Sequence, residues 1–215
     1  MNKATRIIVS TLGIIFGIGG ISHGIFEILQ GNTPTDGMII SAIGEAQRMW
    51  VHGNEIAFTI IPNFLVTGIA AVIVGLMIVI WSATSLNKKN GPLVFILLFI
   101  LLFLVGGGVG QIIFFTLIWA AATRINKPLT WWRKILPTTL RRVLAKLWPA
   151  LLIICSLLII FALEIAIFGY IPGMNDPDRI LTIMLSSLGF GLLVLLSTFV
   201  AGFAYDIEMQ DNLLE

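Results

Sequence analysis

The sequence predicts an all-α integral membrane protein, a polytopic bundle of four to five transmembrane helices. The chain is 58% hydrophobic and only 11% charged, whereas soluble proteins have about 25% charged residues. Its mean hydropathy is +1.01. Three of its uncharged stretches are longer than the roughly 20 apolar residues that cross a bilayer. We therefore expect a multi-pass protein of the cell membrane whose immediate partner is the lipid bilayer.

Charge and cysteine content narrow the classes further. The net charge is only +2, and the basic residues are confined to short segments, so we expect no nucleic-acid partner. The single cysteine, Cys155, allows no internal disulfide. No repeat and no low-complexity linker divides the chain, which favours a single integral membrane domain over residues 1–215.

Five apolar segments, each closed by polar or turn residues, are the predicted spans. The first follows Lys3 and Arg6, as a secretory signal would. However, its apolar run continues to about Ile28 with no small-residue cleavage site, so an uncleaved span is expected. The spans are placed at about 7–29, 57–82, 93–122, 148–171 and 180–204.

The third segment is too long for one straight span. The 34 uncharged residues between Lys89 and Arg124 would form a helix of about 51 Å, against a hydrocarbon core of about 30 Å. In its middle lies GGGVGQ, residues 106–111. Two topologies fit: five straight spans with the N-terminus outside, or a hairpin broken at the glycines with the N-terminus inside.

The basic residues favour the hairpin, because cytoplasmic flanks collect Lys and Arg. The hairpin places all thirteen of them except Arg48 and Arg179 on the cytoplasmic side, whereas five straight spans place eight there. Against this, a backbone turn at membrane depth needs protein or water to satisfy its amides, and straight spans are far more common. Both topologies remain open from the sequence.

Two connecting segments are predicted to be amphipathic helices at the membrane interface. One covers about 138–148, with apolar residues at i, i+3, i+4 and i+7 and basic residues on the other face. The second covers about 37–50, with Asp36 as its N-cap. The residues expected to contact lipid or a partner are Arg141, Arg142, Lys146, Trp131 and Trp132.

Small residues form a stripe along the first predicted span, at Gly13, Gly17, Gly20 and Gly24. Glycines at this spacing let another helix approach closely. The stripe therefore predicts a packing groove, either within the chain or toward a second copy or another membrane protein.

Five polar residues within or beside the spans are candidates for binding an ion or solute. His23 and Glu27 share a helix face, and Glu164 is flanked by apolar residues, so we expect its carboxyl to be paired or protonated. His23, Glu27 and Glu164 lie at the same membrane face only if residues 93–122 form the hairpin. The full set is His23, Glu27, Asn63, Gln111 and Glu164.

Both histidines are followed by glycine and, within a turn, by glutamate. Imidazole and carboxylate donors suit zinc, iron or manganese, so His23, Glu27, His52 and Glu55 form a candidate divalent metal site. Three functions follow. The first is binding or passage of an ion or small polar solute, the second a structural or regulatory membrane subunit, and the third a metal-dependent enzyme. The enzyme is the least favoured, since no catalytic motif is present and no catalytic residue is predicted.

Overall fold

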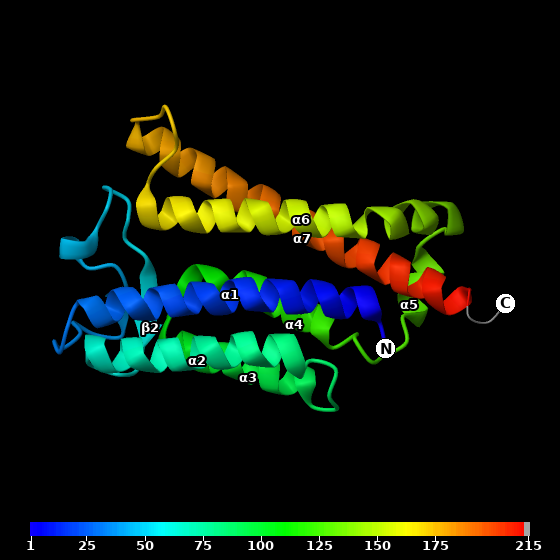
Figure 1. Ribbon diagram of the computed structural model, residues 1–215, viewed down its shortest axis with the longest axis horizontal. Coiled ribbons are helices and arrows are strands. Elements are labelled where there is room, and N and C mark those ends of the chain that lie inside the picture. Colours follow the sequence, from blue (N-terminus) through cyan, green and yellow to red (C-terminus); the bar gives the residue numbers. More distant parts are fainter. Residues whose placement is uncertain (213–215) are drawn as a thin grey trace.

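Four long helices dominate the computed structural model, which describes residues 1–212 (Figure 1). They are α1 (Lys3–Leu29), α2 (Phe64–Thr84), α6 (Thr138–Phe168) and α7 (Pro177–Asp211). Each is long and apolar enough to cross a membrane. The chain is mostly helical, and its four candidate spans agree with the predicted bundle of transmembrane helices, although a small sheet is present as well.

Residues 93–122 fold back on themselves, as the hairpin topology predicts. α3 (Gly91–Leu104) leads into strand β3 (Val105–Gly108), the 3-10 turn η2 (Val109–Gln111) and α4 (Ile112–Ala122). The two ends of the hairpin meet, because Asn126 donates a hydrogen bond to the carbonyl of Asn87. Gly106 has φ +106°, a conformation that residues with a side chain rarely adopt. One straight span over this segment is therefore wrong.

A small antiparallel sheet satisfies the backbone of the hairpin turn. Its order is β1 (Ile39–Ser41), β2 (Ile56–Thr59) and β3. The amide of Ile60 also donates to the carbonyl of Leu104, at the end of α3. A turn buried in a membrane must find such partners within the protein. The sheet thus explains how the broken span is tolerated.

The sheet also corrects two predictions. The expected helix over 37–50 is wrong, because these residues form β1 and the 3-10 turn η1 (Glu45–Gln47). The predicted span 57–82 begins only at Phe64, after β2. The helical spacing of apolar residues in 37–50 did not decide the structure. Pairing with β2 buries Ile40 and Ala42 against Ala57 in an apolar cluster within the protein.

The segment 138–148 is helical as predicted, but it is not a separate interfacial helix. It is the first part of α6, which continues through Pro149 as one helix of 31 residues. Proline removes only one helical hydrogen bond. Meanwhile Arg141 and Trp148 contact Glu208 and Tyr205 on α7, which hold this segment along the bundle. The remaining helix, α5 (Thr130–Ile135), is short.

The two ends of the bundle differ sharply in charge. At the "basic end" lie the N-terminus, the loops 85–90 and 123–137 and the end of α7, joined by hydrogen bonds from Asn2 to Arg124 and from Gln210 to Asn2. At the opposite "sheet end" lie the sheet and the α6–α7 turn. Eleven of the thirteen Lys and Arg residues belong to the first turns of α1, the segments 85–90 and 123–137 and the first turns of α6, whereas Arg48 and Arg179 belong to segments of the sheet end.

The glycine stripe of α1 is used inside the chain. A methyl group at Gly24 would lie 2.6 Å from the carbonyl oxygen of Gly68 on α2, and one at Gly20 would lie 2.6 Å from Leu102 on α3. Gly13 and Gly17 likewise face α2. These four glycines are therefore occupied by neighbouring helices, and an interface with another chain would need a different surface.

The helices associate in two groups. α1 packs extensively on α2, and α6 packs extensively on α7, whereas α1 and α6 touch little. α7 meets α1 at the basic end, where the Asp206 carboxylate accepts hydrogen bonds from the amides of Ala4 and Thr5 and from the Thr5 hydroxyl. α1 and α6 leave a space between them in the sheet half.

Candidate functional site

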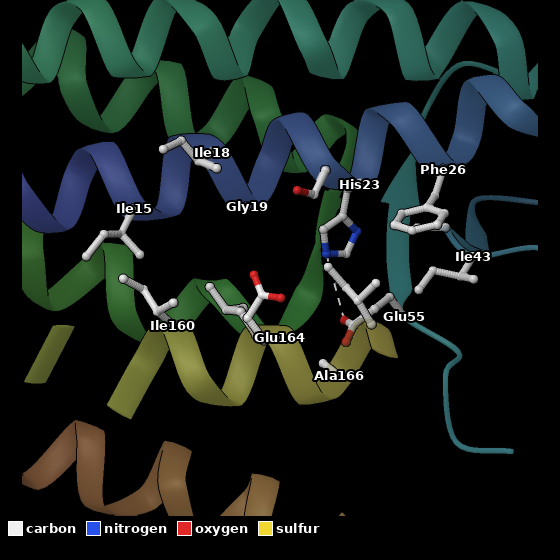
Figure 2. A pocket seen from close by; sticks show the side chains of 14 residues that line it. Ile15, Ile18, Gly19, His23, Phe26, Ile43, Glu55, Ile160, Glu164 and Ala166 are labelled. Atoms are coloured by element: carbon white, nitrogen blue, oxygen red, sulfur yellow. Dashed lines mark ion pairs between the residues drawn. The ribbon is translucent and has the colours of Figure 1, made fainter. Parts of the chain in front are cut away.

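A cavity of about 210 Å³ lies between α1 and α6 in the sheet half of the bundle (Figure 2). Its wall is mostly hydrocarbon, from residues such as Ile15, Phe26 and Ile160. Ligand cavities for drug-sized molecules are typically about 300–1,000 Å³, so this one suits a smaller molecule or part of a larger one. The polar residues in its wall are Ser22, His23, Glu55 and Glu164.

Three separate segments bring the ionisable side chains together. His23 projects from α1, on the same side as Gly19, and Glu164 projects from α6 toward it (Figure 2). Glu55 comes from the loop before β2, where the amide of Ala42 donates a 2.7 Å hydrogen bond to the Glu55 carbonyl. The sheet thus fixes the backbone that carries Glu55. As the hairpin topology predicts, His23, Glu27 and Glu164 all lie at the sheet end.

The cavity carries more negative than positive ionisable groups. Nε2 of His23 lies 3.8 Å from a Glu55 carboxylate oxygen. Burial raises the pKa of the Glu55 carboxyl, whose side chain is one-third exposed. No lysine or arginine lines the cavity. The arrangement can accept hydrogen bonds from, or pair with, a cationic or proton-donating group.

Glu164 has no partner of its own in residues 1–212. No basic side chain lies within ion-pair distance of it, and its side chain is exposed at the cavity mouth. It precedes the end of α6 at Phe168 by four residues, or about 6 Å along the helix. The expected partner is thus not found within the described chain. Its position near the helix end leaves it exposed where it lines the cavity.

Glu27 points away from this cavity, toward the hairpin turn. It is fully buried, and neither carboxyl oxygen has a hydrogen-bond donor within the described residues. A side chain on Gly106 would collide with this carboxyl group. One turn earlier, the His23 ring lies against Gly108, where an added methyl group would be 2.6 Å from Nε2. The glycines of the turn are therefore needed to seat both side chains.

The remaining polar candidates have structural surroundings. Asn63 caps α2, accepting from the amide of Val66 and donating to the side chain of Asn32. Gln111 is buried against Gly19, with its amide nitrogen unpartnered in the described chain. Neither side chain lines the cavity.

The four proposed metal ligands do not meet. His52 lies 3.1 Å from Asp178 at the start of α7, and only His23 and Glu55 approach one another. Across residues 1–212, no three side chains of His, Cys, Asp or Glu are grouped to hold a metal ion. The sequence placed both histidines at the same end, but the folding of the loop separates their side chains.

The basic residues near 131–146 serve different roles. Arg141 is buried and pairs with Glu208 and with Asp211 at 3.0 Å on α7. Trp132 packs on Phe203. Three of the predicted lipid or partner contacts remain exposed, namely Trp131, Arg142 and Lys146.

Two features of the site were missed by sequence reasoning. Glu55 was assigned only to the metal site. Ser22, next to His23, was not predicted to line a cavity. The triplet of glycines was the available signal for where Glu27 points, since glycines mark where backbone can approach a side chain closely. Comparisons with protein-family models, with curated proteins and with solved structures gave no match.

Proposed function

We propose that this protein binds a small cationic solute with an apolar body in the cavity between α1 and α6, at the outer face of the cell membrane. The observation that carries the proposal is the meeting of Glu55, Glu164 and His23 in a wall that is otherwise mostly hydrocarbon. The apolar wall suits an alkyl or ring system, and two carboxylates without a neighbouring lysine or arginine suit an ammonium group.

The outer location follows from the charge of the two ends. Cytoplasmic flanks of membrane proteins collect Lys and Arg, so the basic end is assigned to the cytoplasm and the sheet end to the outside. The cavity is confined to the sheet half, and α7 packs on α1 at the basic end. This favours binding at one face over passage across the membrane. Transport would require α1 and α6 to separate further toward the basic end.

The other two functions gain less support. The glycine stripe was the surface that most specifically suggested a subunit role. It is not available to a partner, because its glycines pack on α2 and α3. A metal-dependent enzyme lacks the grouped ligands that a divalent ion needs, within residues 1–212. Solute binding therefore remains the function that the geometry favours.

The test compares three probes with the same six-carbon chain: hexylammonium, hexanol and hexanoate. The purified full chain in lipid nanodiscs is titrated with each, and binding is measured by calorimetry. We expect hexylammonium to bind, with hexanol weaker and hexanoate weakest. Glu55→Gln and Glu164→Gln should each weaken hexylammonium binding about tenfold, the effect of about 1.4 kcal/mol.

Glu45→Gln provides the matched control, because Glu45 is an exposed carboxylate at the same end that does not line the cavity. It should bind hexylammonium as the wild type does. Equal affinity for hexanoate and hexylammonium would refute the proposal. Unchanged hexylammonium binding in both cavity variants would refute it as well.

A further inference from the structure

The hairpin tip holds a second polar site, which is separate from the cavity. Glu27 is completely buried, and neither of its carboxyl oxygens finds a hydrogen-bond donor among residues 1–212. Its carboxyl group is aimed at Gly106, the tip of the hairpin. An ionised carboxylate buried without a partner is costly, so Glu27 must either hold a proton or be paired with a cation that the described chain does not supply.

The chain offers Glu27 no counter-charge. No lysine or arginine lies within ion-pair distance of it in the described residues. His23, one turn away on α1, directs Nε2 toward Glu55 instead. All but two of the lysines and arginines lie at the opposite end of the bundle. A positive charge near Glu27 must therefore come from solution.

The backbone that faces Glu27 is the irregular tip of the hairpin. β3 pairs with β2 at Val105 and Gly108, but only Phe58 stands opposite Gly106 and Gly107. Two residues facing one form a bulge, in which the extra residue has no ladder partner. α3 also ends at this tip, at Leu104. The C-terminal ends of helices present carbonyl oxygens and a partial negative charge. Broken membrane helices bind cations with such groups.

We propose that Glu27 and the backbone carbonyl oxygens of the hairpin tip bind one sodium ion. A single carboxylate balances a single positive charge, whereas a divalent ion would leave a net charge in a buried site. Within residues 1–212, Glu27 belongs to no group of three His, Cys, Asp or Glu side chains of the kind that holds a divalent ion. The glycines of the turn are in close contact with Glu27, Leu102 and His23, which favours sodium over the larger potassium ion.

This site would communicate with the cavity through α1. His23 touches Gly108 of the hairpin tip on one side and lines the cavity on the other. Sodium at Glu27 would hold the tip in place and, through it, the His23 ring. The sodium site itself does not depend on the cavity having a ligand.

The test measures sodium binding directly on the purified full chain in nanodiscs. Equilibrium binding of ²²Na⁺ should show one site per chain, displaced by unlabelled NaCl but at least tenfold less well by KCl. Thermal unfolding in NaCl should occur at a higher temperature than in choline chloride of equal concentration. Glu27→Gln should abolish both effects, while Glu164→Gln should retain them.

Three results would overturn the inference. The first is absence of ²²Na⁺ binding to the wild type, which needs no variant to fold. The second is a Glu27→Gln protein that is as stable as the wild type and equally insensitive to sodium, which would show that a proton neutralises the carboxyl. The third is equal loss of sodium binding in Glu164→Gln, which would move the ion to the cavity. Hexylammonium binding is measured separately, so failure of either proposal is distinguished from failure of the other.

Discussion

Substituting Gly106 by alanine should destabilise the hairpin tip more than any other single methyl group added in that turn. Two terms contribute. A residue other than glycine at φ +106° is strained by about 1–3 kcal/mol. The added methyl group also collides with the Glu27 carboxyl, and overpacking of this kind costs about 1–3 kcal/mol. The loss expected for Gly106→Ala is therefore about 2–6 kcal/mol.

Gly110→Ala is the matched control for Gly106→Ala. Gly110 lies in the same turn, has no positive φ, and an added methyl group there would meet no atom within 4 Å. Its effect should be within about 0.5 kcal/mol of zero. The measurement is reversible unfolding in mixed micelles of increasing denaturing detergent, followed by helical circular dichroism.

A double-mutant cycle with Glu27→Ala separates the two terms. If the collision with Glu27 is real, Gly106→Ala should cost about 1–3 kcal/mol less in the Glu27→Ala background than in the wild type. The backbone strain should persist in both backgrounds. The reasoning is refuted if Gly106→Ala is no more destabilising than Gly110→Ala. Strict additivity in the cycle would refute the steric part alone.

Three further predictions concern topology, pH and the basic end. In a Cys155→Ser background, a cysteine introduced at Asn54 should react with an impermeant thiol reagent added outside. A cysteine introduced at Asn90 should react only after the membrane is permeabilised. Reaction of both from outside would exclude the assigned topology. Burial raises the pKa of the Glu55 carboxyl, so folding favours its protonated form. The stability due to this group is therefore present at low pH and lost as pH rises through the folded pKa. Glu55→Gln should flatten this loss as pH rises above the ordinary glutamate range, measured by thermal unfolding. Asp206→Ala should cost about 2–4 kcal/mol, because it leaves the buried donors of Thr5 unsatisfied, and a loss below about 0.5 kcal/mol in the same micelle assay would contradict this reading.

The sequence by itself determined the class of protein and the approximate position of its four long helices. Apolar runs predict transmembrane helices because a bilayer forces each segment to satisfy its backbone internally, through bonds between residues four apart. The same reasoning exposed the anomaly at 93–122, since its length exceeds the hydrocarbon core. The distribution of Lys and Arg then favoured the hairpin, although the sequence left the straight topology open.

Only the tertiary structure decided what the polar residues do. The strand at 39–41 exists because it pairs with 56–59, and that pair in turn borders 105–108. Local periodicity in 37–50 could not reveal such partners, and a helix was predicted in error. Arg141, which the sequence placed at the lipid surface, pairs with Glu208 from a helix about 67 residues later.

The candidate sites show the same division. The sequence identified His23, Glu27 and Glu164 by the cost of placing polar groups among apolar ones. It could not show that Glu55 joins His23 and Glu164 in one cavity, or that Glu27 faces Gly106. Helices can be predicted from neighbouring residues because their hydrogen bonds join residues four apart. A site depends on side chains from distant segments, and the packing of the whole chain decides which of them meet.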